Sequence, residues 1–295
     1  MILSTQTDYL GRMFDDIQAV QILSEAGFDA LDYTMFGMKD DAHPLNAPDY
    51  LNYVHRLKDA AAAAGRSFRQ AHAPFPSMRL DDDAYNSSIF DKLTRTIEIV
   101  GLLGVQIIVI HPIHHLEYAS HTEELRQINM EFYRSLAPYA KAANVRIALE
   151  NMWQRNRETK QIVPSACSRT KEFIDYLDTL GDDCFTACLD LGHSGLYGFD
   201  AAEMIKGLGK NRLGALHVHD NDYQSDAHMV PFLGKMHWDT ICDALAQIGY
   251  TGDLTLEADN FYTPFGRELA PAAAKFLAAC GRRLIDMIEN SAVEK

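Results

Sequence analysis

Six short apolar runs in this sequence each end on a carboxylate or a histidine. These residues are His72, His111, Glu150, Asp190, His219 and Glu257. Apolar runs of this length, flanked by turn residues, are typical of buried β-strands. Side chains at the ends of successive buried strands converge only when the strands are parallel. A (β/α)8 barrel has this geometry, and its chemistry lies at the carboxyl ends of its strands.

A strand-then-helix rhythm runs along the chain of 295 residues. We expect strands over 2–6, 30–35, 67–72, 105–111, 145–150, 185–190, 213–219 and 253–257. We expect helices over 14–26, 49–64, 89–103, 122–143, 170–180, 201–208, 238–248 and 266–290. Gly65 and Gly104 stand where a helix gives way to a strand, as C-cap glycines do. The rhythm predicts an α/β fold, a (β/α)8 TIM barrel that residues 1–295 form as a single domain.

Composition narrows the range of partners. The chain is 47% hydrophobic and 23% charged, with a net charge of −14. Proteins that bind phosphate backbones usually present a basic face, so this balance disfavours nucleic acid and favours a small neutral or cationic partner. No apolar run approaches the ~20 residues that span a bilayer, and the N-terminus lacks the pattern of a signal peptide. We therefore expect a cytoplasmic protein without membrane contact; the sequence allows a homo-oligomer.

Several common types of site are not indicated. The five cysteines include no C-x-x-C pair, so we expect reduced thiols and no disulfide. The sequence has neither a G-x-G-x-x-G fingerprint nor a G-x-x-x-x-G-K-[ST] loop, so a nucleotide cofactor is not indicated. It also lacks the G-x-S-x-G motif of serine hydrolases.

Glu150, Asp190, His219 and Glu257 form a mixed set of oxygen and nitrogen donors. Such a set suits one divalent ion, Mn²⁺, Co²⁺, Mg²⁺ or Zn²⁺. Three carboxylates at one rim repel one another unless a cation neutralises them. Any one of these residues alone is better explained as an ordinary loop carboxylate or a core histidine. Four of them at the ends of four parallel strands favour a shared metal ion.

A second layer of residues widens the candidate site. His72, His111 and His193 are further imidazoles near strand ends, and Asp226 and His228 form a D-x-H motif. Additional nitrogen donors favour zinc or a multinuclear site. Each of these residues is also consistent with substrate binding, and the D-x-H motif with a solvated loop. Both interpretations stay open.

His217 and His219 flank Val218 near the end of one expected strand. We expect only one of the two histidines to point into the barrel, and we choose His219 because it lies closer to the rim. His217 is then a packed residue or supports a ligand from behind. Aromatic residues near the rim loops, such as Phe75 and Trp153, either pack on a sugar ring or belong to the core.

These motifs together resemble the xylose-isomerase-like barrel superfamily of sugar isomerases and epimerases, which also includes DNA-repair enzymes of the endonuclease IV type. The resembling segments, in the order of the family, are HAPF, VIHP, ALENMW, CLDLGH, LHVHDND, DAH and GYTGDLTLEAD. They cover nearly the whole chain. The resemblance implies a metal held by Glu150, Asp190, His219 and Glu257. In the ketose 3-epimerase branch, it also implies that Glu150 and Glu257 are the acid/base pair.

The two branches of the family imply different roles for the second layer. In the endonuclease branch, a three-zinc cluster is completed by residues that match His72, His111, His193, Asp226 and His228. In the epimerase branch, the histidine matching His193 contacts the sugar. Ketose 3-epimerases place a substrate-binding glutamate where this chain has Asn156, and an arginine where it has Ser225. The chain therefore departs from that branch at two substrate-binding positions.

Our leading hypothesis is a metal-dependent isomerase or epimerase of a small-molecule sugar, polyol or keto-sugar. Glu150 or Glu257 removes a proton next to a metal-polarised carbonyl, and the resulting enediolate is reprotonated. Loss of a β-hydroxyl from the same enediolate makes a dehydratase or another lyase. One alternative is an endonuclease IV-like zinc phosphodiesterase, for which the sequence lacks a basic surface. Another is a barrel that binds a sugar without turnover.

Overall fold

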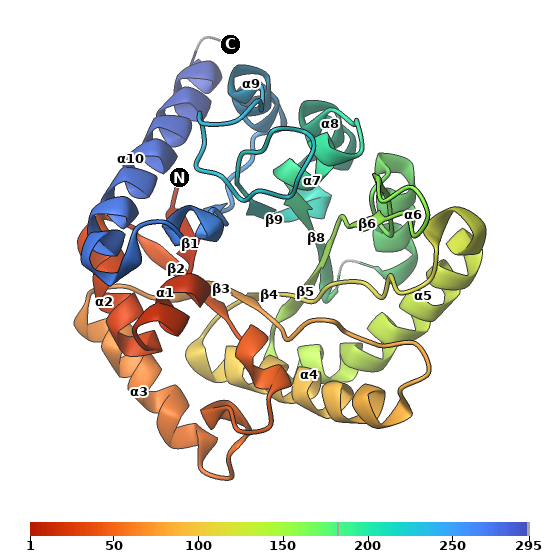
Figure 1. The fold of residues 1–295 in the computed structure, drawn as a ribbon, viewed down its shortest axis with the longest axis horizontal. Helices are drawn as coiled ribbons and strands as arrows, with labels where there is room; N and C mark the ends of the chain where they lie inside the picture. The colour runs from red at the N-terminus through yellow and green to blue at the C-terminus, as the bar shows by residue number, and fades with distance from the viewer. Residues whose placement is uncertain (182, 294–295) are drawn as a thin grey trace.

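A computed structural model describes residues 1–181 and 183–293. Its eight-stranded sheet is parallel throughout, in the order β10-β1-β2-β3-β4-β5-β8-β9 (Figure 1). A parallel bridge from Val218 to Leu256 joins the end of β9 to β10 and closes the barrel. The strands are β1 (Leu3–Gln6), β2 (Ala30–Thr34), β3 (Phe68–His72), β4 (Ile107–Val109), β5 (Arg146–Glu150), β8 (Phe185–Asp190), β9 (Leu213–His217) and β10 (Leu254–Leu256).

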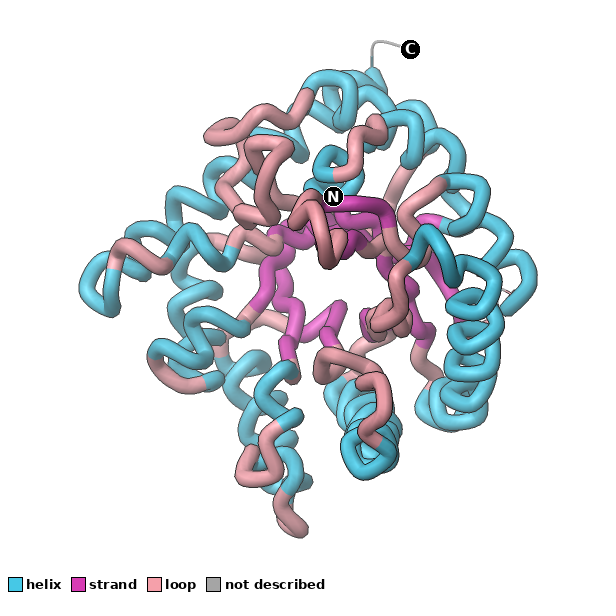
Figure 2. Tube along the Cα trace, turned by 45° about the vertical axis from the view of Figure 1, so that its right-hand side comes forward, coloured by secondary structure: helices cyan, strands magenta, loops and turns pink. Residues whose placement is uncertain are grey.

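Helices form a ring outside the strands, as Figure 2 shows. The covering helices are α2 (Asp16–Ala26), α3 (Tyr50–Ala63), α4 (Asp83–Leu103), α5 (Tyr118–Ala143), α6 (Thr170–Leu180), α8 (Ala201–Arg212), α9 (Trp238–Ile248) and α10 (Gly266–Val293). Short elements lie in the connections: α1 (Asp8–Met13), α7 (Leu191–Leu196), η1 (Phe36–Lys39), η2 (Pro44–Asn46) and η3 (Asp259–Tyr262). Most of the buried apolar side chains pack between the strands and this outer ring.

Small residues fill the barrel interior below its carboxyl-terminal rim. Val109, Ala148, Cys188 and Ala215 form a separate buried cluster, one residue from each of four neighbouring strands. Side chains two positions apart on a strand share a face. The residues two positions further along these strands, His111, Glu150, Asp190 and His217, therefore point to the same interior one layer higher. The strand period thus sets which side chains can meet at the rim.

The predicted barrel is confirmed. All eight expected strands are present, and four of the expected helices, those over 170–180, 201–208, 238–248 and 266–290, begin at the positions expected. The hairpin of β6 (Trp153–Arg155) and β7 (Ile162–Pro164) was not expected, and neither were α1 and α7. Each of these lies in a connection, where short segments carry too few residues to show a period.

The state of the cysteines agrees with the sequence. All five cysteines lie in the part of the chain that the structure describes, and each is buried and unpaired. Within residues 1–181 and 183–293, no helix combines the length and the apolar character needed to cross a bilayer.

Candidate metal centre

Four side chains converge at the carboxyl ends of the barrel strands: Glu150, Asp190, His217 and Glu257. We call them the inner group. Glu150, Asp190 and His217 are the last residues of β5, β8 and β9, and Glu257 directly follows β10. Each offers one ligand atom, and these atoms all lie within 4.8 Å of one another. All four residues are buried, so the barrel itself fixes their spacing.

The inner group leaves several buried polar atoms without hydrogen-bond partners. His217 Nδ1 lies 3.3 Å from Glu150 Oε1 and 3.0 Å from Glu257 Oε2. Yet both nitrogens of His217, Glu150 Oε2 and Glu257 Oε2 have no hydrogen-bond partner within residues 1–181 and 183–293. A buried polar atom without a partner costs about 1–3 kcal/mol. Lone pairs that converge in this way are suited to a cation, so the residues present fit a divalent ion.

The pKa values in the inner group follow from its excess of carboxylates. Burial acts to raise the pKa of Glu150, but the imidazoles of His217 and His111 outweigh burial and hold it well below its usual value. Burial also acts to raise the pKa of Glu257, and His217 again reverses the direction. Burial acts to lower the pKa of His217, whereas Cys188, Glu257 and Glu150 raise it well above its usual value. The group favours positive charge at its centre.

The structure places His217, rather than the predicted His219, in one group with Glu150, Asp190 and Glu257. The strand register pairs Asp190 with His217, and His217 is the last residue of β9. Because the two histidines are two positions apart on an extended segment, both point to the interior rather than one in and one out. Both are fully buried. His217 lies one layer deeper, beside Glu150 and Glu257, and His219 lies above it.

His219 belongs to a second set of donors, with His193, Asp226 and His228. We call this set the outer group; its ligand atoms also lie within 4.8 Å of one another. Asp226 Oδ2 is 3.5 Å from His193 Nε2 and 3.3 Å from His228 Nε2. The rings of His219 and His228 stack at 4.2 Å with an interplanar angle of 8°. The structure thus brings together three of the second-layer residues that the sequence singled out.

Asp190 links the two groups. Its two carboxylate oxygens each lie 3.1 Å from His219 Nε2, and Oδ1 also accepts a hydrogen bond from the backbone N–H of His193 at 2.7 Å. Gly192 is required beside them, because a Cβ atom there would lie 2.1 Å from His219 Cε1. The segment from Asp190 to His193 therefore serves both groups.

Charge in the outer group is balanced between carboxylate and imidazole. Burial acts to lower the pKa of His193, but Asp190 and Asp226 raise it to about 10. Burial acts to raise the pKa of Asp226, and His193 and His228 hold it far below its usual value. The group is therefore an ion-paired cluster at the rim, with donors that also suit a metal or a polar substrate.

The remaining two histidines predicted for the site occupy different positions. His111 Nε2 lies 3.1 Å from Glu150 Oε2, and its ring packs on Phe75 with the centroids 4.7 Å apart. His72 is fully buried and stacks on His217 at 4.4 Å. Its Nδ1 is 2.9 Å from Asp32 Oδ1. His72 thus contacts the inner group from below, and His111 from the side.

Sequence reasoning missed two residues that contact this site from below, Gln6 and Asp32. Gln6 donates from Nε2 to Glu257 Oε1 at 2.6 Å. Asp32 is a buried carboxylate in the middle of the apolar strand β2. A charged residue inside an apolar run, and an amide at the end of β1, were the signals available in the sequence.

The residues at the two positions that depart from the ketose 3-epimerase pattern form hydrogen bonds within their own turns. Asn156 lies between β6 and β7, where its Oδ1 accepts hydrogen bonds from the backbone N–H groups of Glu158 and Thr159. Ser225 Oγ donates to Asp222 Oδ1 at 3.2 Å. Trp153, by contrast, donates from Nε1 to Asp226 Oδ2 at 3.2 Å. The aromatic ring of Trp153 therefore borders the outer group.

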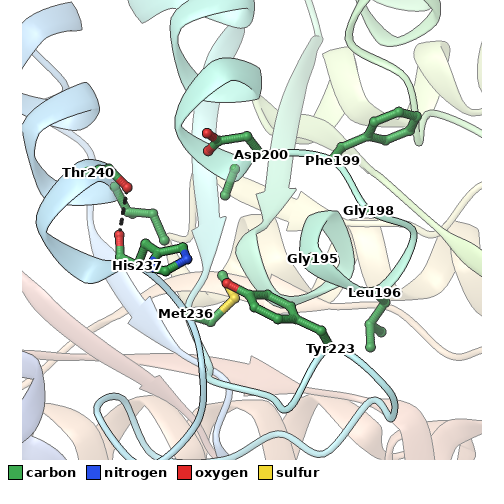
Figure 3. A pocket seen from close by; sticks show the side chains of 11 residues that line it. Gly195, Leu196, Gly198, Phe199, Asp200, Tyr223, Met236, His237 and Thr240 are labelled. Carbon is green, nitrogen blue, oxygen red and sulfur yellow. Dashed lines mark hydrogen bonds between the residues drawn. The ribbon is translucent and has the colours of Figure 1, made fainter.

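A hollow of about 480 Å³ lies beside the loops of the outer group (Figure 3). In this view the side chains of Tyr223 and Met236 lie below Gly195, His237 lies to the left of Met236, and Asp200 lies above. The ring of Tyr223 occupies the space that a Cβ at Gly195 would take. No residue of the inner or the outer group lines this hollow, so it is separate from the candidate metal centre.

A profile described as "Xylose isomerase-like TIM barrel" matches residues 20–280. An uncharacterized protein of Mycobacterium leprae is 25% identical over 220 residues, which cover 68% of this chain and 74% of that protein. The D-psicose 3-epimerase of Ruminiclostridium cellulolyticum is 25% identical over 246 residues, covering 81% of this chain and 76% of the epimerase.

Solved structures share the fold along the whole chain. The crystal structure of a D-tagatose 3-epimerase-like protein superposes with a TM-score of 0.76 at 18% identity, covering 98% of this chain and 99% of that one. The IOLI protein, whose structure has a binding zinc atom, superposes with a TM-score of 0.73 at 16% identity, covering 98% and 99%. At these identities the likeness concerns the fold.

Proposed function

The chain belongs to the xylose isomerase-like TIM barrel family, and from this premise we propose that it is a metal-dependent isomerase or epimerase of a small sugar. The observation that carries the proposal is the inner group. Two carboxylates, Glu150 and Glu257, lie against His217 Nδ1 at the carboxyl ends of the strands, in a buried set in which each of these three residues keeps a polar atom without a hydrogen-bond partner among the described residues. This end of a barrel is where chemistry takes place.

Glu150, Asp190, His217 and Glu257 would hold the ion, with His217 in the place first given to His219. Three carboxylates and one imidazole suit Mn²⁺, Co²⁺, Mg²⁺ or Zn²⁺. When bound, the ion polarises a substrate carbonyl and so acidifies the neighbouring C–H. The zinc atom of the IOLI structure supports a divalent ion in this fold.

Glu150 and Glu257 are the proposed acid and base. Because both lie against His217 Nδ1, at 3.3 and 3.0 Å, they face the same small volume from different strands. One carboxylate takes the proton next to the carbonyl, which leaves an enediolate of the sugar, and a proton returns from the same or the opposite carboxylate. Return to the other face gives an epimer, and return to the neighbouring carbon gives an isomer. Loss of a β-hydroxyl instead gives a dehydratase.

The outer group is the proposed contact for the rest of the sugar. Trp153 presents an aromatic ring beside Asp226 and His193, and these polar atoms can bind hydroxyl groups. The names of the similar proteins support a ketose or related keto-sugar. Since Asn156 and Ser225 are used in their own turns, the sugar is held differently from the ketose 3-epimerase pattern. We propose a neutral small-molecule substrate, in keeping with the net charge of −14, and, with five unpaired cysteines, a cytoplasmic protein.

A solvent-exchange assay tests the proposed function. The protein is loaded with Mn²⁺ and incubated in D₂O with a panel of ketoses, aldoses and keto-sugars, and deuterium uptake next to the carbonyl is followed by NMR. We expect uptake into at least one sugar, and we expect Glu150→Gln and Glu257→Gln to abolish it. Binding of a sugar without any uptake would refute the enzyme and leave a binding protein.

A second candidate, a zinc phosphodiesterase, rests on one observation. His193, Asp226 and His228 lie close enough in the outer group to hold an additional ion, and a multinuclear zinc site can place hydroxide beside a phosphodiester. Elemental mass spectrometry separates the candidates. Two or three zinc ions per chain, with cleavage of abasic DNA, would favour the phosphodiesterase; one ion per chain without cleavage favours the isomerase or epimerase.

A further inference from the structure

The two oxygens of Glu257 have different surroundings. Oε1 accepts a hydrogen bond from Gln6 Nε2 at 2.6 Å. Oε2 lies 3.0 Å from His217 Nδ1 and has no hydrogen-bond partner in the part of the chain that the structure describes. Glu150 lies within 3.1–3.4 Å of nitrogens of three histidines, His111, His193 and His217. Glu257 is therefore the carboxylate that an amide holds from below.

The amide of Gln6 continues into a buried chain of polar contacts. Gln6 Nε2 lies 3.3 Å from His72 Nε2. On the other edge of the ring, His72 Nδ1 lies 2.9 Å from Asp32 Oδ1, and Asp32 Oδ2 accepts from Gln70 Nε2 at 2.7 Å. None of these residues is more than 5% exposed. They come from the neighbouring strands β1, β2 and β3, so the barrel holds these polar contacts in place.

The direction of every hydrogen bond in this chain follows from its two carboxylates. An ionised carboxylate only accepts, so the atom of Gln6 at 2.6 Å from Glu257 is the amide nitrogen. The second N–H of that nitrogen points to His72 Nε2, which then accepts. A neutral imidazole with an accepting Nε2 carries its proton on Nδ1, and Nδ1 faces the accepting Asp32. Asp32 thus selects the tautomer of His72 that leaves Nε2 free to accept from Gln6.

We propose that Asp32, His72 and Gln6 are positioning residues that fix the carboxylate of Glu257, with Oε1 held and Oε2 presented to the ion and the substrate. The inference rests on the proposed function for the role of Glu257. It gives Glu257 one reactive oxygen in a fixed place, while Glu150 is set by histidines. It also means that His72 is not a metal ligand.

The same geometry argues against an ion between Asp32, His72 and His217, although their ligand atoms lie within 4.8 Å of one another. Both nitrogens of His72 already have partners. The rings of His72 and His217 stack at 4.4 Å with an interplanar angle of 24°. Imidazole lone pairs lie in the ring plane, so those of two stacked rings run side by side rather than converge.

Ring-¹⁵N histidine NMR tests the tautomer directly, without substrate. The protein is labelled at the imidazole nitrogens, and His72 is assigned from the signals missing in His72→Gln, or in His72→Asn where the first variant does not fold. We expect Nδ1 protonated and Nε2 unprotonated, and we expect both shifts to persist when Zn²⁺ is added. A metal-induced shift of either His72 nitrogen to the range of a ligand, or a proton on Nε2, would overturn the proposal.

Mn²⁺ titration calorimetry tests the effect on Glu257. Gln6→Met keeps the side-chain volume and removes both N–H donors. We expect it to weaken Mn²⁺ binding by about tenfold at unchanged stoichiometry, as loss of a hydrogen bond behind a ligand does. Asp32→Asn places an NH₂ group against an N–H donor of His72 or Gln70. We expect this variant also to bind Mn²⁺ more weakly. The control is Ser4→Ala, on the same strand face as Gln6, whose buried hydroxyl has no partner.

The outcomes separate this inference from the proposed function. Wild-type affinity in Gln6→Met, or the loss of a whole ion in His72→Gln, would refute the positioning chain. A wild-type protein that binds no Mn²⁺, or turns over no sugar, would refute the proposed function. The tautomer of His72 in the metal-free protein would still test the proposed hydrogen bonds among Gln6, His72 and Asp32.

Discussion

The inner and outer groups use the same types of side chain but are built in different ways. The inner group stands on strand ends, and its side chains are at most 8% exposed. The outer group stands on α7 and on the long segment between β9 and α9, where the side chains of Asp226 and His228 are 19% and 17% exposed. The barrel therefore fixes the inner group, whereas a connection holds the outer group.

That connection is itself anchored by one buried carboxylate. Asp220 accepts hydrogen bonds from the backbone N–H groups of Phe232 and Met236, each at 3.0 Å, and from Trp238 Nε1 at 2.9 Å. Gly234 is needed there, since its Cβ would lie 2.2 Å from Asp220 Oδ1. Asp226 and His228 lie inside the anchored segment, so the outer group is ordered without being part of the barrel.

The largest expected difference between the groups is in turnover. Glu150→Gln and Glu257→Gln remove a proposed acid or base, and we expect kcat to fall by about 10²–10⁴-fold, the usual contribution of such a group. His228→Asn removes an outer donor, and we expect a change of about tenfold, mainly in KM. Deuterium exchange rates measure both. A loss in His228→Asn as large as in the glutamate variants would show that the two groups act as one.

Removal of the metal ion distinguishes the inner group from the outer group through the thermal stability of the protein. A ligand that binds only the folded state at 100 times its Kd adds about 2.7 kcal/mol. We expect chelation to lower the Tm and Mn²⁺ to restore it, and we expect Asp190→Asn to lose the effect of Mn²⁺ while His228→Asn keeps it. Differential scanning calorimetry measures these shifts. Loss of the Mn²⁺ effect in His228→Asn would place the first ion in the outer group.

Gly192→Ala disturbs the outer group from behind. The added methyl group meets His219 Cε1 at 2.1 Å, so His219 must move, and overpacking of this kind costs about 1–3 kcal/mol. We expect urea unfolding to show that loss while Mn²⁺ affinity falls by less than about tenfold. Since Asp190 contacts both groups, a complete loss of Mn²⁺ binding would mean that they cannot be separated.

The smallest expected effect concerns Glu172. It tests how imidazole neighbours change the pKa of a carboxylate that is removed from solvent. Glu172 accepts a hydrogen bond from Tyr118 Oη, and burial raises its pKa from 4.5 to about 7, with smaller opposing effects from Tyr118 and Arg169. A raised pKa stabilises the fold below pH 4.5, and this contribution is lost as pH rises through 7. Between pH 5 and pH 8 we expect the wild type to lose about 1–2 kcal/mol relative to Glu172→Gln.

Urea unfolding at both pH values measures the difference, and Glu123→Gln, an exposed carboxyl on α5, is the matched control. An equal pH dependence in the wild type and Glu172→Gln would contradict the raised pKa. The inner carboxylates are more deeply buried than Glu172, but His217 faces them, and their pKa values are lowered.

Much of the fold could be read from the chain because the signals are local. Runs such as VRIALE and FTACLD carry the strand pattern within six residues, and each ends on its own carboxylate, Glu150 or Asp190. The hairpin of β6 and β7 and the short helix α7 escaped prediction because three to six residues show no period. The outer group could be named residue by residue but not assembled, since its members come from α7 and from the connection after β9.

The sequence by itself determined the barrel and the rim at which its acidic residues lie, because strand period and turn residues are properties of neighbouring positions. The tertiary structure alone decided that His217 and not His219 lies between Glu150 and Glu257, since this depends on how β8 pairs with β9. It alone joined Gln6 to Glu257, which are 251 positions apart. Such a contact exists only once β10 pairs with β1, and no local pattern can encode a bond that closure of the barrel creates.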